Sequence, residues 1–133
     1  MTYTYEFLSE AGCFVVTCSG RVSAQDMLEL VVALESHPEF RPGLNRLVDF
    51  RSATMFLSAE QVAAISREIR DRDGLHGKRR VAFVVDDDVS YGVLRMAVGH
   101  SVLAQFELRV VRDQDEAKEW IGLSTDYVLP ADR

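Results

Sequence analysis

Four side chains form the one set in this sequence that could carry out chemistry together: Asp49, Arg51, Tyr91 and Arg95. If they met in one cleft, a carboxylate with a displaced pKa could act as an acid or base. The two guanidinium groups could hold an anion. The same residue types more often form structural ion pairs and aromatic packing, and we favour that second interpretation.

Motifs typical of catalysis or metal binding do not occur. The three histidines lack the spacing of a metal site, and there is neither a nucleophile elbow nor a phosphate-binding glycine loop. Asp49 and Asp86 could in principle share Mg²⁺, but a carboxylate that caps a turn or pairs with arginine is the more frequent arrangement. We therefore expect a protein that is not an enzyme and has neither a metal nor a cofactor.

The 133-residue chain is acidic, with a formal net charge of −6. Domains that bind nucleic acid by neutralising phosphates are usually basic, so we expect no nucleic-acid partner. The basic run Lys78-Arg79-Arg80 is interpreted as a solvated loop. The sequence contains no membrane span and its N-terminus does not resemble a signal peptide, so a cytoplasmic location is expected.

Cys13 and Cys18 are the only cysteines. They lie five residues apart on one predicted strand, so they point to opposite faces and are too far apart for a disulfide. We expect two buried, inert thiols that share no metal.

Periodicity and turn residues predict a single α/β domain over residues 1–123, followed by a C-terminal tail over 124–133 that is mobile at its end. An N-terminal hairpin precedes strands at 46–50, 81–85 and 106–110, with a loop at 51–57 and a polar connection at 71–80. Four helices begin near residues 23, 58, 90 and 113, and the third is expected to reach residue 104.

The predicted order β-β-α-β-α-β-α-β-α indicates a five-stranded, mostly parallel sheet with an antiparallel N-terminal hairpin strand and four helices. Two of these helices begin with capping boxes, one formed by Ser23 and Asp26 and the other by Ser58 and Gln61.

In open α/β sheets, ligands bind beyond the carboxyl ends of the parallel strands. The predicted elements bring seven candidate residues to that edge: Arg21, Asp49, Arg51, Phe56, Ser58, Tyr91 and Arg95. An apolar run, Met-Phe-Leu at 55–57, lies in the predicted loop and indicates an interface or a pocket lid. We expect a partner protein or self-association as a homodimer, with a small apolar or anionic ligand as a further alternative.

The element order and five short segments resemble the STAS domain of anti-sigma-factor antagonists, and more closely the small stand-alone SpoIIAA-like proteins. The segments are GRVSAQD at 20–26, HPEFRPG at 37–43, LVDFR at 47–51, YGVLRM at 91–96 and DEAKEWI at 115–121. The resemblance covers nearly the whole chain and implies a STAS-like fold. It also implies a distant relation in fold to the lipid-binding CRAL-TRIO (Sec14-like) domains. Fold by itself says less about function.

In STAS antagonists a serine at the start of the second helix is phosphorylated, and Ser58 is the matching position here. The family motif has an aspartate before the serine and a glycine after it, whereas this chain has Leu57 and Ala59. Glu60 would also repel a phosphate on Ser58. A helix N-cap is therefore the favoured role of Ser58.

The sequence leaves three alternative functions open. The first is a non-enzymatic STAS-like binding or regulatory module that recognises a protein partner or small ligand near the strand ends. The second is Sec14-like binding of a lipid or other apolar molecule, which requires a sizeable apolar cavity. The third is an enzyme built on the Asp49, Arg51, Tyr91 and Arg95 set, which requires these side chains to converge.

Overall fold

A computed structural model describes residues 1–101 and 104–133. Five strands form one sheet, and they lie side by side in chain order: β1 (Thr2–Leu8), β2 (Cys13–Val22), β3 (Asn45–Met55), β4 (Arg79–Val84) and β5 (Phe106–Val111). β1 is antiparallel to β2, and all other neighbours are parallel. The predicted mixed α/β fold with an antiparallel N-terminal strand is confirmed.

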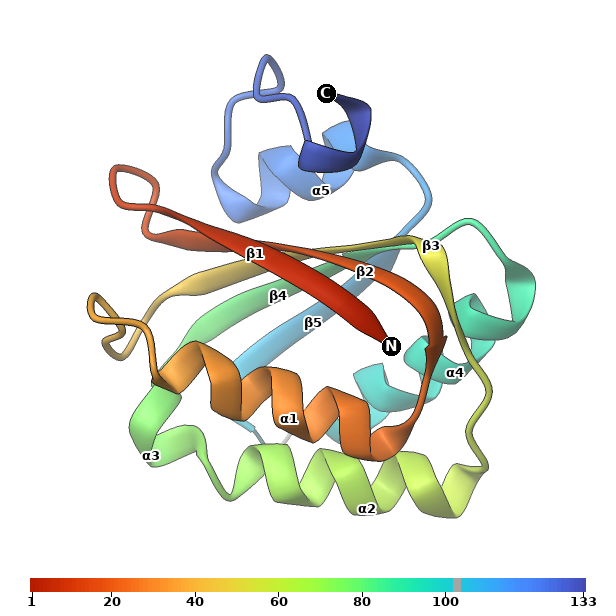
Figure 1. Ribbon diagram of the computed structural model, residues 1–133. Helices are drawn as coiled ribbons and strands as arrows, with labels where there is room; N and C mark the ends of the chain where they lie inside the picture. The colour runs from red at the N-terminus through yellow and green to blue at the C-terminus, as the bar shows by residue number, and fades with distance from the viewer. Residues whose placement is uncertain (102–103) are drawn as a thin grey trace.

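The helices are α1 (Ala24–Glu35), α2 (Ala59–Arg70), α3 (Asp73–His76), α4 (Asp88–His100) and α5 (Gln114–Ile121), followed by the 3-10 helix η2 (Pro130–Asp132). Figure 1 shows α1, α2 and α4 on one face of the sheet, and α5 with η2 on the other. From β2 to β5 each strand is added on the same side of the one before it. Because connections between parallel strands are right-handed, all the helices that connect these strands lie on the same face of the sheet. α5 follows the last strand and is free to cover the opposite face. The predicted third helix extended to residue 104; α4 ends at His100, and residues 102–103 lie outside the described residues.

Both predicted capping boxes are confirmed. Ser23 Oγ accepts a hydrogen bond from the Asp26 amide at 3.0 Å, and the Ser23 amide donates to Asp26 Oδ2 at 2.9 Å. Ser58 Oγ accepts from the Gln61 amide at 3.1 Å, and the Ser58 amide donates to Gln61 Oε1 at 2.9 Å. Two of the otherwise free amides at the start of each helix, those of the N-cap residue and of the third helical residue, are therefore satisfied by the chain itself.

Each face of the sheet has its own hydrophobic core. The larger core, beneath α1, α2 and α4, includes Phe14 and Phe50; the smaller one, beneath α5, includes Leu47. Cys18 belongs to the larger core and Cys13 to the smaller, so the two thiols lie on opposite faces as predicted. Burial raises the pKa of each thiol to about 12, which keeps both protonated and unreactive.

A β-bulge carries β3 beyond its predicted end. Between Asp49 and Ser52, β3 has one more residue than β2 opposite it. The extra residue shifts the alternation of side chains, so Phe50, Ala53 and Met55 all reach the larger core. The predicted loop at 51–57 is therefore wrong as far as Met55, because the strand predicted to end at residue 50 continues to Met55.

The connection between α2 and β4 was predicted to be polar and solvated, but part of it is buried. It contains the one-turn α3, and its His76 is 0% exposed. Arg79 is also buried, so the basic run at 78–80 is not wholly the solvated loop that was expected. Gly77 has a φ of +66°, and a Cβ there would lie 2.9 Å from the Pro42 side chain, so this close packing of two turns requires glycine.

The C-terminal segment, residues 123–133, packs against the face that carries α5 (Figure 1). Leu129 is completely buried there. Arg133 donates a hydrogen bond to Glu6 at 2.8 Å, and the Tyr127 hydroxyl donates to the same carboxylate. The segment expected to be mobile at its end is instead tied to β1.

Candidate functional site

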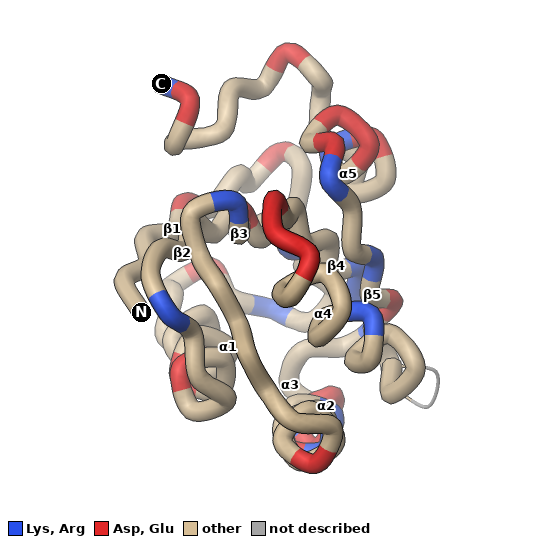
Figure 2. The backbone as a smooth tube through the Cα atoms, turned by 90° about the vertical axis from the view of Figure 1, so that its right-hand side faces the viewer, with Lys and Arg blue, Asp and Glu red and all other residues tan. Residues whose placement is uncertain are grey.

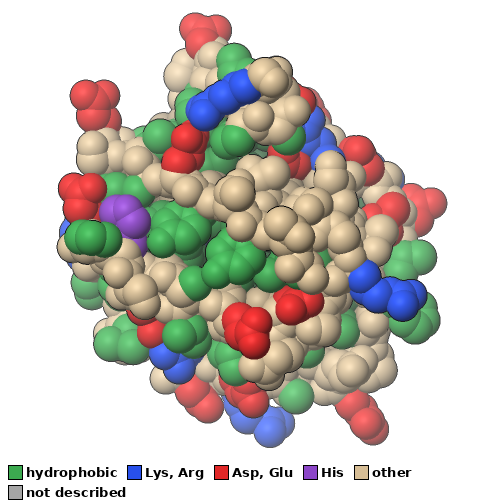
Figure 3. Space-filling model, viewed as in Figure 1, with side chains coloured by type: hydrophobic (Ala, Val, Ile, Leu, Met, Phe, Trp, Pro, Cys, Tyr) green, Lys and Arg blue, Asp and Glu red, His purple; other side chains and the backbone are tan. Residues whose placement is uncertain are grey.

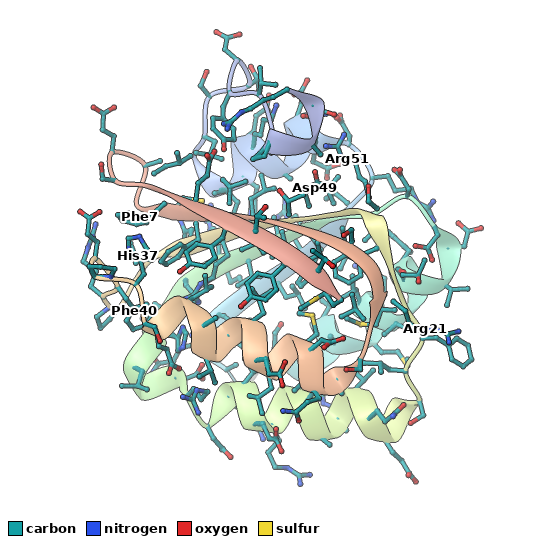
Figure 4. The ribbon with its side chains drawn as sticks, in the orientation of Figure 1. Phe7, Arg21, His37, Phe40, Asp49 and Arg51 are labelled. Atoms are coloured by element: carbon teal, nitrogen blue, oxygen red, sulfur yellow. The ribbon has the colours of Figure 1, made fainter. Side chains whose placement is uncertain are left out.

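The structure distributes the seven predicted site residues over three places. Arg21, Phe56 and Ser58 surround the beginnings of α1 and α2, and Tyr91 and Arg95 belong to α4. Asp49 and Arg51 lie together on β3, on the face toward η2, and well away from Arg21 (Figure 4). Within the described residues, no hydrogen bond or ion pair joins Asp49 or Arg51 to the two residues of α4. The four side chains considered for an enzyme therefore do not form one set.

Asp49 and Arg51 form a two-pronged ion pair. Arg51 Nε donates to Asp49 Oδ1 at 2.8 Å, and Nη2 donates to Oδ2 at 2.7 Å. The same guanidinium donates to Asp132 of η2 at 3.1 and 3.2 Å. Hydrogen bonds from Arg51 lower the pKa of Asp132, and those to Asp49 raise the pKa of Arg51. This arrangement joins the sheet to the C-terminal segment. Asp49 is only 2% exposed and both of its carboxylate oxygens accept hydrogen bonds from Arg51, so neither oxygen is accessible to a substrate.

The two candidates on α4 lie four residues apart and so project from the same side of the helix, but they have different surroundings. Tyr91 is half-buried, and the guanidinium carbon of Arg112 lies 4.8 Å from its ring centroid. Arg112 in turn donates to Asp88 at 2.5 Å, within the acidic run that follows β4 (Figure 2). Arg95 is exposed on the helix surface. The neighbouring Ser90 Oγ accepts from the Met55 amide at 2.9 Å and so attaches α4 to the end of β3.

A surface hollow of about 300 Å³ lies between the N-termini of α1 and α2. Arg21, Phe56 and Gln61 line it, and it adjoins a groove of about 170 Å³ between the two helices that also includes Gln61. Phe56 is 77% exposed, although the flanking Met55 and Leu57 are buried. Of the three places that hold the predicted site residues, this one combines exposed side chains with a concave surface.

Ser58 lies beside this hollow as the N-cap of α2. Its hydroxyl accepts the Gln61 amide, and its side chain is exposed. The geometry gives Ser58 a structural role, and the position is also open to solvent.

A buried polar network at the opposite end of the sheet was not anticipated from the sequence. Arg72 donates two hydrogen bonds of 2.6 Å to Glu35, and Glu35 also accepts from His76 Nε2 at 2.9 Å. His76 Nδ1 accepts from Arg46 at 2.6 Å. The feature of the sequence that could have indicated the network is Arg46, at the start of an apolar strand. Arginine is unusual at a buried position and needs polar partners there.

The network shifts several pKa values. Hydrogen bonds from Arg72 hold the pKa of Glu35 at about 2. Burial lowers the pKa of His76 to about 4 and that of Arg46 to about 9. Near neutral pH, Glu35 is therefore ionised, His76 is neutral and Arg46 remains a cation.

An aromatic band along the β1 edge is a second feature that the sequence did not indicate. Figure 3 shows hydrophobic side chains gathered between β1 and α1, with a histidine beside them. The ring of His37 lies 5.2 Å from Phe7, 5.5 Å from Phe14 and 6.1 Å from Tyr5, centroid to centroid. Its Nδ1 accepts the Glu39 amide at 3.1 Å. The ring is thus held as part of the packing where α1 ends.

Among the described residues, no group of three histidine, cysteine or acidic side chains could hold a metal ion. The two apolar cavities between the sheet and α1, α2 and α4 measure about 70 Å³ each. None of the described helices is long and apolar enough to cross a membrane.

These observations define a small α/β domain with a five-stranded sheet, capped helices and a surface hollow at the start of its second helix. A sequence model of the SpoIIAA-like family matches residues 13–122, and the chain belongs to that family. A solved structure with the same fold is an uncharacterized protein from the DUF3478 family with a SpoIIAA-like fold, from Shewanella loihica PV-4. It is 19% identical, with a TM-score of 0.57 over 90% of this chain and 92% of that one, and so shows the fold alone. No curated protein matches the sequence.

Proposed function

We propose that this protein is a non-enzymatic regulatory module that binds a partner protein through the hollow surface formed by Arg21, Phe56 and the N-terminus of α2. The observation that carries the proposal is Phe56, which is 77% exposed between two buried neighbours. A phenyl ring held in water by a short, anchored connection favours burial against another protein. The SpoIIAA-like fold, which suggests a binding or regulatory role, supports the same conclusion.

The chemistry of this surface suits a protein contact. Aromatic and arginine side chains contribute much of the binding energy at protein interfaces, and Phe56 and Arg21 share one rim. Both capping boxes are already closed, so the amides of the N-cap residue and of the third residue of each helix are engaged within the chain. A partner would therefore bury the ring and contact the guanidinium.

A second copy of this chain is the partner that we propose to test first. In a twofold dimer each Phe56 can enter the hollow of the other copy, because the ring and the hollow lie next to each other on one surface. A cytoplasmic location is part of the proposal, and the two unpaired cysteines support it.

Binding of a whole membrane lipid gains no support from the interior. Each apolar cavity measures about 70 Å³, which is the volume of roughly two or three water molecules in the liquid. An acyl chain of membrane length would require α2 to move away from the sheet.

The test is light scattering on the purified protein over a wide range of concentration, with Phe56→Asp beside the native chain. We expect a concentration-dependent dimer for the native protein and a monomer for Phe56→Asp, because a carboxylate cannot be buried in the hollow without a partner charge.

The matched control is Val128→Asp, which adds the same charge at a residue 50% exposed in the C-terminal segment. This variant should dimerise like the native protein. A native chain that stays monomeric, or a dimer that Phe56→Asp leaves unchanged, would contradict self-association through this surface.

A further inference from the structure

β5 is an edge strand of the sheet, at the side farthest from β1, and β4 is its only strand neighbour (Figure 1). The Arg79 amide donates to the Gln105 carbonyl at 3.1 Å, and the Val85 amide donates to the Val111 carbonyl at 3.0 Å. In a parallel pair, residues bonded to the neighbouring strand alternate with residues whose backbone groups point away from it. Three residues of β5 therefore direct their amide and carbonyl groups outward, away from the sheet: Phe106, Leu108 and Val110.

Two charged side chains stand on the same face of this open edge. Leu108 and Val110 face the larger core, so Glu107 and Arg109 face the side of the sheet that carries α5. The Glu107 side chain is 71% exposed, and its one ion pair within the described residues is with Arg80 Nε, at 3.8 Å. Arg109 is also exposed, and its guanidinium carbon lies 4.6 Å from the Trp120 ring centroid. No described carboxylate forms an ion pair with Arg109.

The sequence of this edge is complementary to itself. If a second copy of β5 lies antiparallel with the two Leu108 residues opposite each other, Phe106 of each chain lies opposite Val110 of the other. Each of these three pairs can then exchange two backbone hydrogen bonds. In the same register, Glu107 of each chain lies opposite Arg109 of the other, on one face. A shift to either neighbouring register would oppose two Glu107 or two Arg109 side chains, so the charges select a single register.

We propose that β5 binds β5 of a second copy of this chain, antiparallel about Leu108, so that the two sheets continue as one. The contact is isologous, with its twofold axis between the two Leu108 residues. Charged side chains on an edge strand commonly prevent pairing with other strands. Here the order of one acidic and one basic residue opposes other partners and registers and admits the edge of an identical chain.

This inference rests on the proposed dimer through Phe56, although the two surfaces are separate. The hollow follows the carboxyl ends of β2 and β3, whereas the contact proposed here is the outer side of β5. A single strand pair buries little surface and is a weak contact by itself. When two Phe56 dimers combine into a closed tetramer, two strand pairs form together and reinforce one another. We therefore expect a dimer-to-tetramer step in the native protein, and Phe56→Asp should remain monomeric.

The first experiment reverses each charge separately. Sedimentation velocity over a rising range of concentration compares the native protein with Arg109→Glu and Glu107→Arg. Each variant opposes like charges at both cross-strand pairs, so the association of dimers into tetramers should weaken at least about tenfold. The matched control is Arg67→Glu, which reverses an exposed arginine of α2 and should assemble like the native protein.

Mixing the two variants tests the register directly. Arg109→Glu has an acidic side chain at both positions, and Glu107→Arg has a basic side chain at both. An equimolar mixture should recover the tetramers that each variant lacks alone, and so should the double exchange in one chain. Recovery in the mixture also shows that neither variant had lost its fold. If the mixture assembles no better than the separate variants, the pairing of Glu107 with Arg109 is overturned.

Amide hydrogen exchange places the contact on the strand. In the native protein, the amides of Phe106, Leu108 and Val110 should exchange more slowly at tetramer concentrations than at dimer concentrations. The amides of Glu107 and Arg109 point to β4 and should exchange equally at both. If tetramers form and the three outward amides gain no protection, a different surface joins the dimers and the proposal fails.

The two self-association surfaces fail in different ways. A native chain that remains a dimer at every concentration overturns the β5 contact and leaves the Phe56 contact standing; this is also the result expected if the edge instead binds a strand of another protein. An assembly that Arg109→Glu dissociates and Phe56→Asp leaves intact overturns the Phe56 contact and supports the β5 contact. A native chain that is monomeric at every concentration overturns both.

Discussion

His76 Nδ1 lies 2.6 Å from Arg46 Nη2 and accepts a hydrogen bond from it. Arginine has only donors and an ionised carboxylate has only acceptors, so the partners on both sides determine the imidazole's protonation. His76 must be neutral, with its proton on Nε2 directed at Glu35, 2.9 Å away. A second proton on Nδ1 would place one N–H opposite another.

This arrangement predicts acid sensitivity. Burial lowers the pKa of His76 to about 4 from its ordinary value of 6.5. Below pH 6.5 the unfolded chain takes up a proton that the folded chain refuses, so stability falls as pH falls. The loss should be about 2 kcal/mol between about pH 7 and pH 5, and complete once the pH passes below about 4. Urea unfolding at these pH values measures it.

His76→Gln provides the comparison, because an amide can accept from Arg46 and donate to Glu35 without titrating. This variant should lose most of the pH dependence between about pH 7 and pH 5. His100→Gln alters an exposed histidine and should retain it. If the free energy of unfolding changed equally with pH in the native protein and in His76→Gln, the assignment of this pH dependence to His76 would be refuted.

The Asp49–Arg51 pair predicts a second result. Asp49→Ala should lower the free energy of unfolding by about 3 kcal/mol, because it leaves a partly buried guanidinium with only Asp132. Arg51→Ala should cost a similar amount, and the double variant should cost less than the sum. Denaturant titration of the three proteins gives the coupling. An increase in stability for Asp49→Ala would instead indicate a strained functional carboxylate.

Leu129 tests the packing of the C-terminal segment. It is completely buried, so Leu129→Ala should cost about 3 kcal/mol of stability. Val128→Ala changes the exposed neighbour and should cost little. Limited proteolysis should spare residues 123–133 in the native protein and cut them in Leu129→Ala. Rapid cleavage of the native segment would contradict the packing.

Ser58 gives a smaller and more local effect. Ser58→Ala removes the cap of α2 and should lower stability by about 1 kcal/mol, as measured by urea unfolding. Ser52→Ala is the control, since Ser52 is exposed and its hydroxyl makes no hydrogen bond to the described residues. If Ser58→Ala is as stable as the native protein, the cap contributes nothing and a different role for this serine gains weight.

Local patterns in the chain predicted the features that depend on local physics. The serine caps at 23 and 58, the apolar strand around Phe83 and the opposite directions of the two cysteines all follow from spacing along a helix or strand. The β3 bulge was missed because one extra residue breaks the alternation by which strands are recognised. The same break concealed that β3 continues beyond residue 50 to Met55.

By itself, the sequence determined the order of the five strands and the four longer helices and the two capping boxes, because these depend on interactions between near neighbours in the chain; it did not predict α3 or η2. Only the tertiary structure decided which distant charges meet: Glu35 with His76 across 41 residues, and Arg51 with Asp132 across 81. Such contacts depend on how elements that are far apart in the chain pack against the same sheet. No periodicity in the sequence records that arrangement, and both the exposure of Phe56 and the burial of Arg46 result from it.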